Sequence, residues 1–335
     1  MSLVIHVANI TFHITGEDFL KALTPVEKKL LRPFIVKGRA LRHSIVTNIK
    51  IIGGSPPKKN NKIGYSLINK IRPFFPADID KRLVESQWQF IENLGFYLSD
   101  KEAKKIANYL RDRDNRNKIV IGGSSLLFFN KEERRCDIIL RQPTSKERRW
   151  AYTLNTLRLL LRIVLNSENE GMLLHASSVE NEGYGYAFIG RGDSGKSTAA
   201  RLLKPQRILS DDTTVIRHND NAYELFANPW WNPDKDITIK YPQRSVPFKA
   251  AFFIKKAKKT SLKRMNYKKA LCALIHRDSV CQQTGFFDNK IGIRNFYLFS
   301  LRFMRDIPVF ELRIKKERSF KSKFKKLVNR YLQNG

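Results

Sequence analysis

The chain has 335 residues, which is enough for two domains, and its content of 42% hydrophobic and 11% aromatic residues excludes general disorder. The formal net charge of +32 favours acidic partners, such as nucleic acid, anionic lipid, nucleotides or an acidic protein, although a generally basic proteome would produce the same value. Three widely spaced cysteines show no metal-ligand pattern, so we expect a reducing compartment and no disulfide framework.

Residues 1–142 are expected to form an N-terminal α+β domain. Short alternating runs predict one or two strands between Val4 and Ile14, and a helical pattern follows from Asp18 to Leu31. Later segments predict a strand, two helices and two further strands, in the order Leu41–Ile52, Ser86–Leu94, Lys101–Arg111, Lys118–Phe129 and Cys136–Leu140. No catalytic cluster is visible here, so we expect this domain to recognise a substrate or to organise a homo-oligomer.

The N-terminus lacks the charged start and the long apolar segment of a signal peptide. The longest apolar-rich segment, Tyr152–Leu165, is interrupted by Arg158 and Arg162, so no membrane span is expected and the protein is predicted to be soluble and cytoplasmic. Apolar residues recur in this segment at helical spacing, which predicts an amphipathic helix. Its two arginines, four residues apart, are expected on the solvent side.

A second domain is expected over residues 150–335, and its clearest motif is a glycine-rich loop. The pattern G-x-x-x-x-G-K-[ST] is matched without a gap by Gly190, Gly195, Lys196 and Ser197. The loop follows the apolar strand Tyr186–Ile189 and precedes a helical segment. In such a loop, backbone N–H groups surround phosphate oxygens, the lysine reaches the β- and γ-phosphates, and the hydroxyl residue holds Mg²⁺. We therefore predict an ATP site that uses Mg²⁺.

The nucleotide contacts are expected from nine consecutive residues: Gly190, Arg191, Gly192, Asp193, Ser194, Gly195, Lys196, Ser197 and Thr198. A carboxylate facing phosphate would be unfavourable, so we interpret Asp193 as a residue that shapes the turn. The next predicted strand, Arg207–Ser210, is followed by Asp211 and Asp212. These two are expected to divide metal binding and proton acceptance between them, with Ser197 and Asp211 as the metal candidates.

His175 lies fifteen residues before the loop, in the segment Met172–Ser178, which reads as a strand able to pair beside the loop strand. On spacing alone, a structural role for a single histidine is the stronger interpretation. A functional role places it at the phosphate site with Lys196, Asp211 and Asp212.

The second half of the chain contains, in this order, the segment LLHASSV, a glycine turn, the segment AFIGRGDSGKST and the segment ILSDD. This arrangement resembles the catalytic domain of HPr kinase/phosphorylase and its related bacterial serine kinases. The segment RDIPVFELRIKKE resembles their terminal strand. The resemblance implies an α/β fold with a P-loop catalytic domain of the HPr kinase and phosphoenolpyruvate carboxykinase-like type, a mixed sheet flanked by helices. By position it implies nucleotide and metal binding by Lys196 and Ser197, metal and base roles for Asp211 and Asp212, and a place near the transferred phosphate for His175.

The sequence departs from that family in three places, and one of them is that His175 is followed by Ala-Ser where HPr kinase has glycine. Asp193 stands where the commonest loop has glycine, and only Gly285 and Gly292 fall where the bifunctional enzyme has a second glycine-rich signature. The resemblance therefore implies neither phosphorylase activity nor HPr as the acceptor. Some relatives phosphorylate a serine of a precursor peptide, so we predict an ATP- and Mg²⁺-dependent kinase acting on a hydroxyl of a small, acidic protein or peptide.

Two other functions fit the same residues. A small-molecule kinase would draw its pocket from the region after residue 225, which contains Trp230, Trp231, Asp234, Asp236 and Arg244. A nucleotide-binding adaptor would dock on nucleic acid or an anionic membrane through the basic C-terminal third. In the last segment, apolar residues recur at helical spacing among lysines: Phe320, Phe324, Leu327 and Tyr331. We favour a terminal helix docked by this face over one that binds membrane or nucleic acid.

Overall fold

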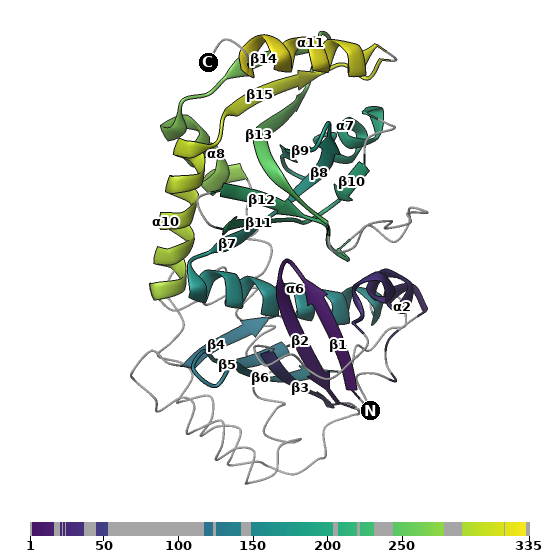
Figure 1. The fold of residues 1–335 in the computed structure, drawn as a ribbon, viewed down its shortest axis with the longest axis vertical. Coiled ribbons are helices and arrows are strands. Elements are labelled where there is room, and N and C mark those ends of the chain that lie inside the picture. The colour runs from purple at the N-terminus through teal and green to yellow at the C-terminus, as the bar shows by residue number, and fades with distance from the viewer. Residues whose placement is uncertain are drawn as a thin grey trace, which may run out of the picture.

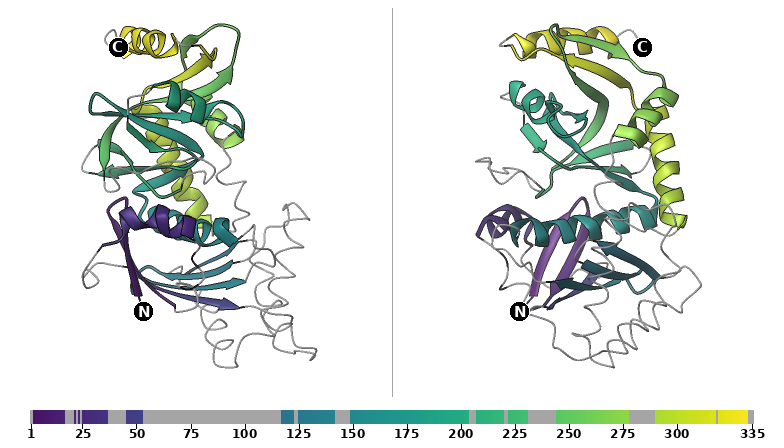
Figure 2. Two further views of the ribbon diagram at one scale, coloured as in Figure 1. Left: turned by 90° about the vertical axis from the view of Figure 1, so that its right-hand side faces the viewer. Right: turned by 180° about the vertical axis from the view of Figure 1, so that it is seen from behind.

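The computed structural model describes residues 2–16, 21, 23, 25–36, 45–52, 117–122, 125–141, 149–203, 207–219, 222–230, 244–277, 290–317 and 319–332. These residues form a mixed α/β fold with two curled sheets (Figure 1). A long helix, α6 (Arg149–Glu168), lies between the two sheets in all three views (Figures 1 and 2).

The first sheet contains six strands in the order β1-β2-β3-β6-β5-β4. Their bounds are β1 Ser2–Val7, β2 Ile10–Thr15, β3 Ile45–Ile52, β4 Asn117–Gly122, β5 Ser125–Asn130 and β6 Arg135–Arg141. The central pairs β2–β3 and β3–β6 are parallel, whereas the outer pairs are antiparallel. Helix α2 (Pro25–Leu31) and the 3-10 turn Arg32–Phe34 follow β2.

Most of the strands predicted in this half are confirmed, with one correction. The segment expected as a single strand from Lys118 to Phe129 is the antiparallel hairpin of β4 and β5, because the run GGSS at residues 122–125 interrupts it. The helix expected from Asp18 is described as α2 from Pro25. The helices expected at Ser86–Leu94 and Lys101–Arg111 lie outside the described residues.

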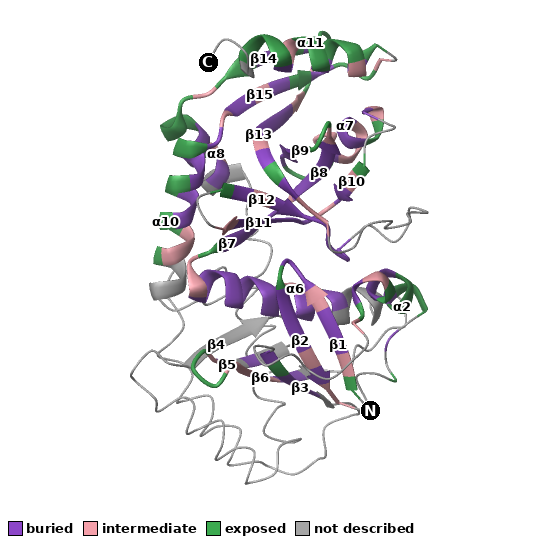
Figure 3. Ribbon diagram, in the orientation of Figure 1, coloured by how far each residue is buried: buried purple, intermediate pink, exposed green. Residues whose placement is uncertain are grey.

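Helix α6 confirms the predicted helix but not its predicted solvent face. Nearly every described side chain from Leu154 to Ser167 is buried or half-buried, and Arg162 is only 8% exposed (Figure 3). The expectation that Arg158 and Arg162 face solvent is wrong, because the helix is covered by a sheet on either side. Its apolar residues join one core with strand residues of both sheets, such as Ile14 and Val215.

The second sheet contains the glycine-rich loop. Its strands follow the order β10-β8-β9-β13-β12-β11-β7, and β15 and β14 continue from β13. The bounds are β7 Gly171–Leu174, β8 Ala176–Asn181, β9 Tyr184–Ile189, β10 Arg207–Ser210, β11 Thr214–Asn219, β12 Ala222–Phe226, β13 Ser245–Lys256, β14 Ser261–Arg264 and β15 Val309–Ile314. The long strand β13 pairs with β12 by its first residues and with β9 and β15 by the rest, which curls the sheet.

Helices cover the two faces of β13 according to the alternation of its side chains. Phe252 faces α7 (Lys196–Leu202) and α11 (Phe320–Leu332), whereas Phe253 faces α8 (Tyr267–Arg277) and α10 (Lys290–Asp306). The predicted docking of the C-terminal helix is confirmed, because Phe320, Phe324 and Val328 are buried and the other side of the helix is exposed (Figure 3).

Candidate functional site

Strand register brings three separate segments to one corner of the second sheet. The chain twice passes from one half of the curled sheet to the other, once at His175 between β7 and β8 and once at Asp211–Thr213 between β10 and β11. Three pairs of strand residues fix the corner: Leu174 with Thr214, Ser178 with Ser210, and Ala176 with Ile189. His175 therefore lies beside both Asp212 and the start of the glycine-rich loop at Gly190.

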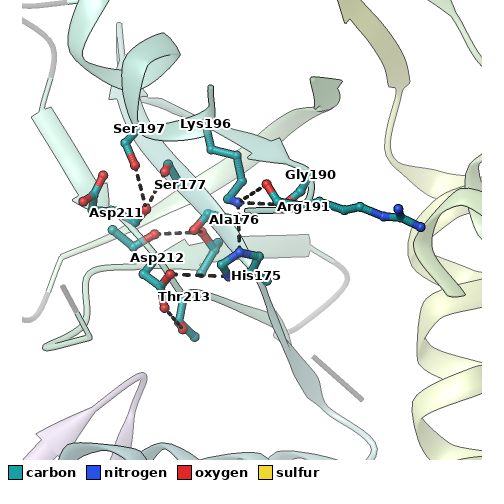
Figure 4. A network of polar contacts seen from close by, with 12 residues as sticks. His175, Ala176, Ser177, Gly190, Arg191, Lys196, Ser197, Asp211, Asp212 and Thr213 are labelled. Carbon is teal, nitrogen blue, oxygen red and sulfur yellow. Dashed lines mark hydrogen bonds and ion pairs between the residues drawn. The ribbon is translucent and has the colours of Figure 1, made fainter. Parts of the chain in front are cut away.

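Lys196 joins the loop to this corner. Its Nζ atom donates to the carbonyl oxygen of Gly190 at 2.7 Å and to that of Arg191 at 2.9 Å, and it lies 2.9 Å from Nε2 of His175 (Figure 4). The side chain is only 6% exposed, so burial strengthens each of these charge-assisted contacts. The ammonium group is thus held at the inner side of the loop.

The loop backbone uses left-handed conformations at Asp193 (φ 56°) and Gly195 (φ 101°). Asp193 is exposed, which agrees with the predicted role in shaping the turn. The Arg191 side chain is exposed and extends away from the other labelled residues in Figure 4, so this residue joins the site through its carbonyl group. Gly192 is exposed, and Thr198 is half-buried in the first turn of α7.

Gly190 and Ser194 are in close contact across the loop. A Cβ atom at Gly190 would lie 2.5 Å from the Ser194 Oγ atom and 3.1 Å from its Cβ atom. The Ser194 hydroxyl is buried and has no hydrogen-bond partner among the described residues. A buried polar group without a partner is costly, so this hydroxyl is a group that a bound ligand could satisfy.

Substitution Gly190→Ala should weaken ATP binding at least about tenfold, because the new methyl group must displace Ser194 and change the loop. Gly192→Ala is the matched control, since a Cβ atom there meets nothing within 4 Å. Titration calorimetry with ATP measures both variants. Equal affinity of the Gly190 and Gly192 variants would show that the close contact has no bearing on binding.

His175 lies between Lys196 and Asp212. Its Nδ1 atom is 3.4 Å from Oδ1 of Asp212, and its side chain is 13% exposed. Burial and the nearby Lys196 ammonium lower the pKa of His175, and the Asp212 carboxylate opposes them only in part. The ring is therefore neutral at pH 7. Because Lys196 donates to Nε2, the ring proton belongs on Nδ1, facing Asp212.

The lowered pKa of His175 predicts a loss of stability on acidification. As the pH falls below about 6.5, the unfolded chain binds a proton at His175 before the folded chain does, so the free energy of unfolding decreases. The His175→Gln variant should lose this part of the pH dependence. Urea unfolding of both proteins between pH 7 and pH 5 measures the difference, and parallel curves would contradict the assigned neutral state.

Asp211 and Ser197 lie on the other side of the corner (Figure 4). The backbone oxygen of Asp211 accepts hydrogen bonds from Ser177 Oγ at 2.5 Å and from Ser197 Oγ at 3.5 Å. The second bond is long, so the Ser197 hydroxyl can turn toward another partner. Asp211 is 4% exposed, whereas Asp212 is half-buried and faces His175.

Sequence reasoning missed Arg158 as a neighbour of this site. The arginine comes from α6, and its Nη1 atom lies 3.4 Å from Oδ2 of Asp212 and 3.1 Å from Oγ1 of Thr213. Arg158 thus holds one carboxylate oxygen of Asp212 while His175 faces the other. The helical pattern predicted the helix, but no local signal shows which sheet would cover its arginines.

Two residues of the alternative small-molecule pocket have other contacts. The Trp230 Nε1 atom donates to the backbone oxygen of Leu154, and Arg244 binds Glu180 at 2.6 Å. Trp231, Asp234 and Asp236 lie outside the described residues.

Fold and site together define a mixed α/β protein with a lysine-bearing glycine-rich loop beside a histidine and two aspartates. A family model described as "SynChlorMet cassette protein ScmC" matches residues 136–329, more than half of the chain, and the chain belongs to this family. No curated protein matches the sequence. A solved HPr(Ser) kinase/phosphatase from Coxiella burnetii is similar with a TM-score of 0.30 and 10% identity, over 49% of this chain and 92% of that one.

Within the part of the chain that the structure describes, no helix has the length and apolar character needed to cross a membrane. The described residues also contain no group of three or more histidine, cysteine, aspartate or glutamate side chains placed to hold a metal ion.

Proposed function

We propose that this chain is a kinase that uses ATP and Mg²⁺ to phosphorylate a hydroxyl group, most simply that of a serine, in a small protein or peptide. The observation that carries the proposal is the line of contacts from the loop carbonyls through Lys196 and His175 to Asp212 (Figure 4). A cation, a neutral imidazole and a carboxylate follow one another beside a loop of small residues. Phosphoryl transfer to a hydroxyl uses a cation that stabilises charge on the transferred group and a base that accepts the hydroxyl proton, and the imidazole would hold these two groups in position.

The residues present fit a phosphate chain and a magnesium ion. The unpartnered Ser194 hydroxyl and the missing Cβ atom of Gly190 suit a backbone that surrounds phosphate oxygens. The Ser197 hydroxyl and the Asp211 carboxylate are oxygen ligands of the type that Mg²⁺ prefers, and these two residues would hold it. Magnesium, when bound, would neutralise negative charge on the phosphates. Lys196 would exchange a carbonyl partner for a phosphate oxygen.

In the proposed reaction, Asp212 accepts the proton of the acceptor hydroxyl. As the hydroxyl oxygen bonds to the γ-phosphorus of ATP, the bond from that phosphorus to the bridging oxygen breaks, and ADP leaves with the electron pair. The proton passes to the Asp212 carboxylate, which is 43% exposed and can therefore be reached from outside. Lys196 stabilises negative charge on the transferred group, and His175 holds Lys196 and Asp212 in position.

The metal assignment is tested by the Mg²⁺ dependence of ATP binding. The wild-type chain should bind ATP more tightly with Mg²⁺ than without it, and Ser197→Ala should reduce this gain roughly tenfold because a charge-assisted oxygen contact is lost. Ser322→Ala is a suitable control, since Ser322 is exposed on α11 and its hydroxyl donates to the Ser319 oxygen of the same segment. An unchanged Mg²⁺ gain in the Ser197 variant would remove this residue from the metal site.

A further inference from the structure

Three parallel strands run toward the edge of the sheet that bears the glycine-rich loop, and β13 and β15 continue three residues past the level at which β9 ends. Strand β13 lies between β9 and β15, and the register aligns Ile189 with Phe253 and Phe253 with Glu311. The glycine-rich loop follows Ile189, so the residues that follow β13 and β15 emerge at the same edge of the sheet as the loop. In sheets with parallel strands, ligands bind at the edge formed by the carboxyl ends of the strands.

The chain segments at this edge carry five exposed lysines, which we name the basic rim: Lys256, Lys258, Lys259, Lys315 and Lys316. Lys256 is the last residue of β13, and Lys315 directly follows β15. Among the described residues, Lys256, Lys258, Lys259 and Lys316 have no acidic side chain within ion-pair distance. Figure 1 shows β13 and β15 side by side beneath α11 at this end of the molecule.

The acidic side chains nearest the rim in sequence are already bound to other cations. Residues 244–264 include no aspartate or glutamate. Glu311 is paired with Lys255 at 2.5 Å and with Arg313 at 3.1 Å, and Glu317 is paired with Lys323 at 2.8 Å. These partners lower the pKa of both glutamates. The positive charge of the rim is therefore not neutralised by the strands that carry it.

We propose that the basic rim docks an acidic segment of the phosphoacceptor and so presents the acceptor hydroxyl to the neighbouring loop. This inference rests on the proposed kinase function and names the chemistry of its substrate. Clustered unpaired lysines attract carboxylate-rich chains over a distance of about 8 Å at physiological ionic strength, which raises the rate of encounter. Docking at the strand ends would make an acidic sequence near the modified serine a determinant of recognition.

A membrane and a nucleic acid fit this surface less well. An interfacial helix inserts its apolar face into lipid, but the apolar face of α11, including Phe320 and Phe324, is buried against the sheet. Single-stranded nucleic acid needs aromatic rings on which bases stack. The most exposed aromatic side chain of α11, Tyr331, packs edge-on against Phe310, and its hydroxyl donates to the Leu262 oxygen.

The test compares two triple variants of the full chain with the same change in net charge. The rim variant carries Lys256→Glu, Lys259→Glu and Lys316→Glu. The control carries Lys28→Glu, Arg32→Glu and Lys268→Glu, whose parent side chains are exposed on α2, the following 3-10 turn and α8. Fluorescence anisotropy measures binding of a fluorescein-labelled oligoglutamate peptide at physiological ionic strength, and calorimetry measures ATP binding by the same proteins.

The rim variant should bind the peptide roughly tenfold or more weakly than the control, with ATP affinity retained in both. Equal losses in the two variants would show that net charge alone binds the peptide and would overturn the proposal. The wild-type chain could instead bind oligothymidylate, or phosphatidylserine-containing vesicles, more tightly than the peptide. If the rim variant lost that binding, the surface would belong to another partner, and this result would also overturn the proposal. Absence of ATP binding by the wild-type chain would instead refute the kinase function, and the peptide result would still decide whether the rim binds acidic chains.

Discussion

Replacement of Lys196 by alanine should reduce phosphoryl transfer by about 10²- to 10³-fold, because the substitution removes the cation that stabilises charge on the transferred group. The same change removes three contacts of the Nζ atom, two with loop carbonyls and one with His175. The loss of these buried contacts should lower the free energy of unfolding by about 1–3 kcal/mol. Transfer from labelled ATP and urea unfolding measure the two effects separately.

Lys268→Ala is the control for this substitution, since Lys268 is an exposed residue of α8 with no ion pair within the described part of the chain. Transfer by this variant should match the wild type. A Lys196 variant that folds and transfers phosphate at the wild-type rate would contradict the assigned role of the ammonium group.

Replacement of Asp212 by asparagine should reduce transfer by about 10²- to 10⁴-fold, because an amide cannot accept the hydroxyl proton. The carboxylate also raises the pKa of His175, so its removal should lower that pKa further from the ordinary value. NMR titration of the histidine ring follows the second effect independently of activity. The two measurements together separate a proton acceptor from a residue that only supports the fold.

Asp306→Asn provides a matched control. Asp306 is 39% exposed and is bound by Arg305, much as Asp212 is 43% exposed and contacts Arg158. Its substitution should leave both transfer and the His175 pKa unchanged. Similar losses in the two variants would indicate a general effect of removing a carboxylate, and Asp212 would then lose its assigned role.

The local elements of the site could be predicted from the sequence because each has its own start and stop signals. Strand β10 has the predicted bounds Arg207–Ser210, and α7 (Lys196–Leu202) forms directly after the loop, where a helical segment is expected. The loop pattern needs only consecutive residues. The terminal helix α11 was predicted for the same reason, since its apolar residues repeat along one face.

The contacts across the site depend on the curl of the second sheet, which no short pattern encodes. Met172–Ser178 reads as one strand, but the chain turns at His175 into a different half of the sheet, and this turn directs the histidine toward Lys196. The position of Arg158 depends on a helix packed between two sheets. Pairing between distant segments decides both features, so periodicity alone could not predict them.

Transfer of label from γ-labelled ATP tests the central claim most directly. The wild-type chain and the Lys196→Ala variant are incubated with Mg²⁺, labelled ATP and a cell extract, and labelled products are identified by mass. The proposed function predicts one labelled small protein or peptide, modified on a hydroxyl residue and absent with the variant. Two results would contradict the proposed function. The wild-type chain could bind ATP and label no protein or peptide, or both proteins could give equal labelling.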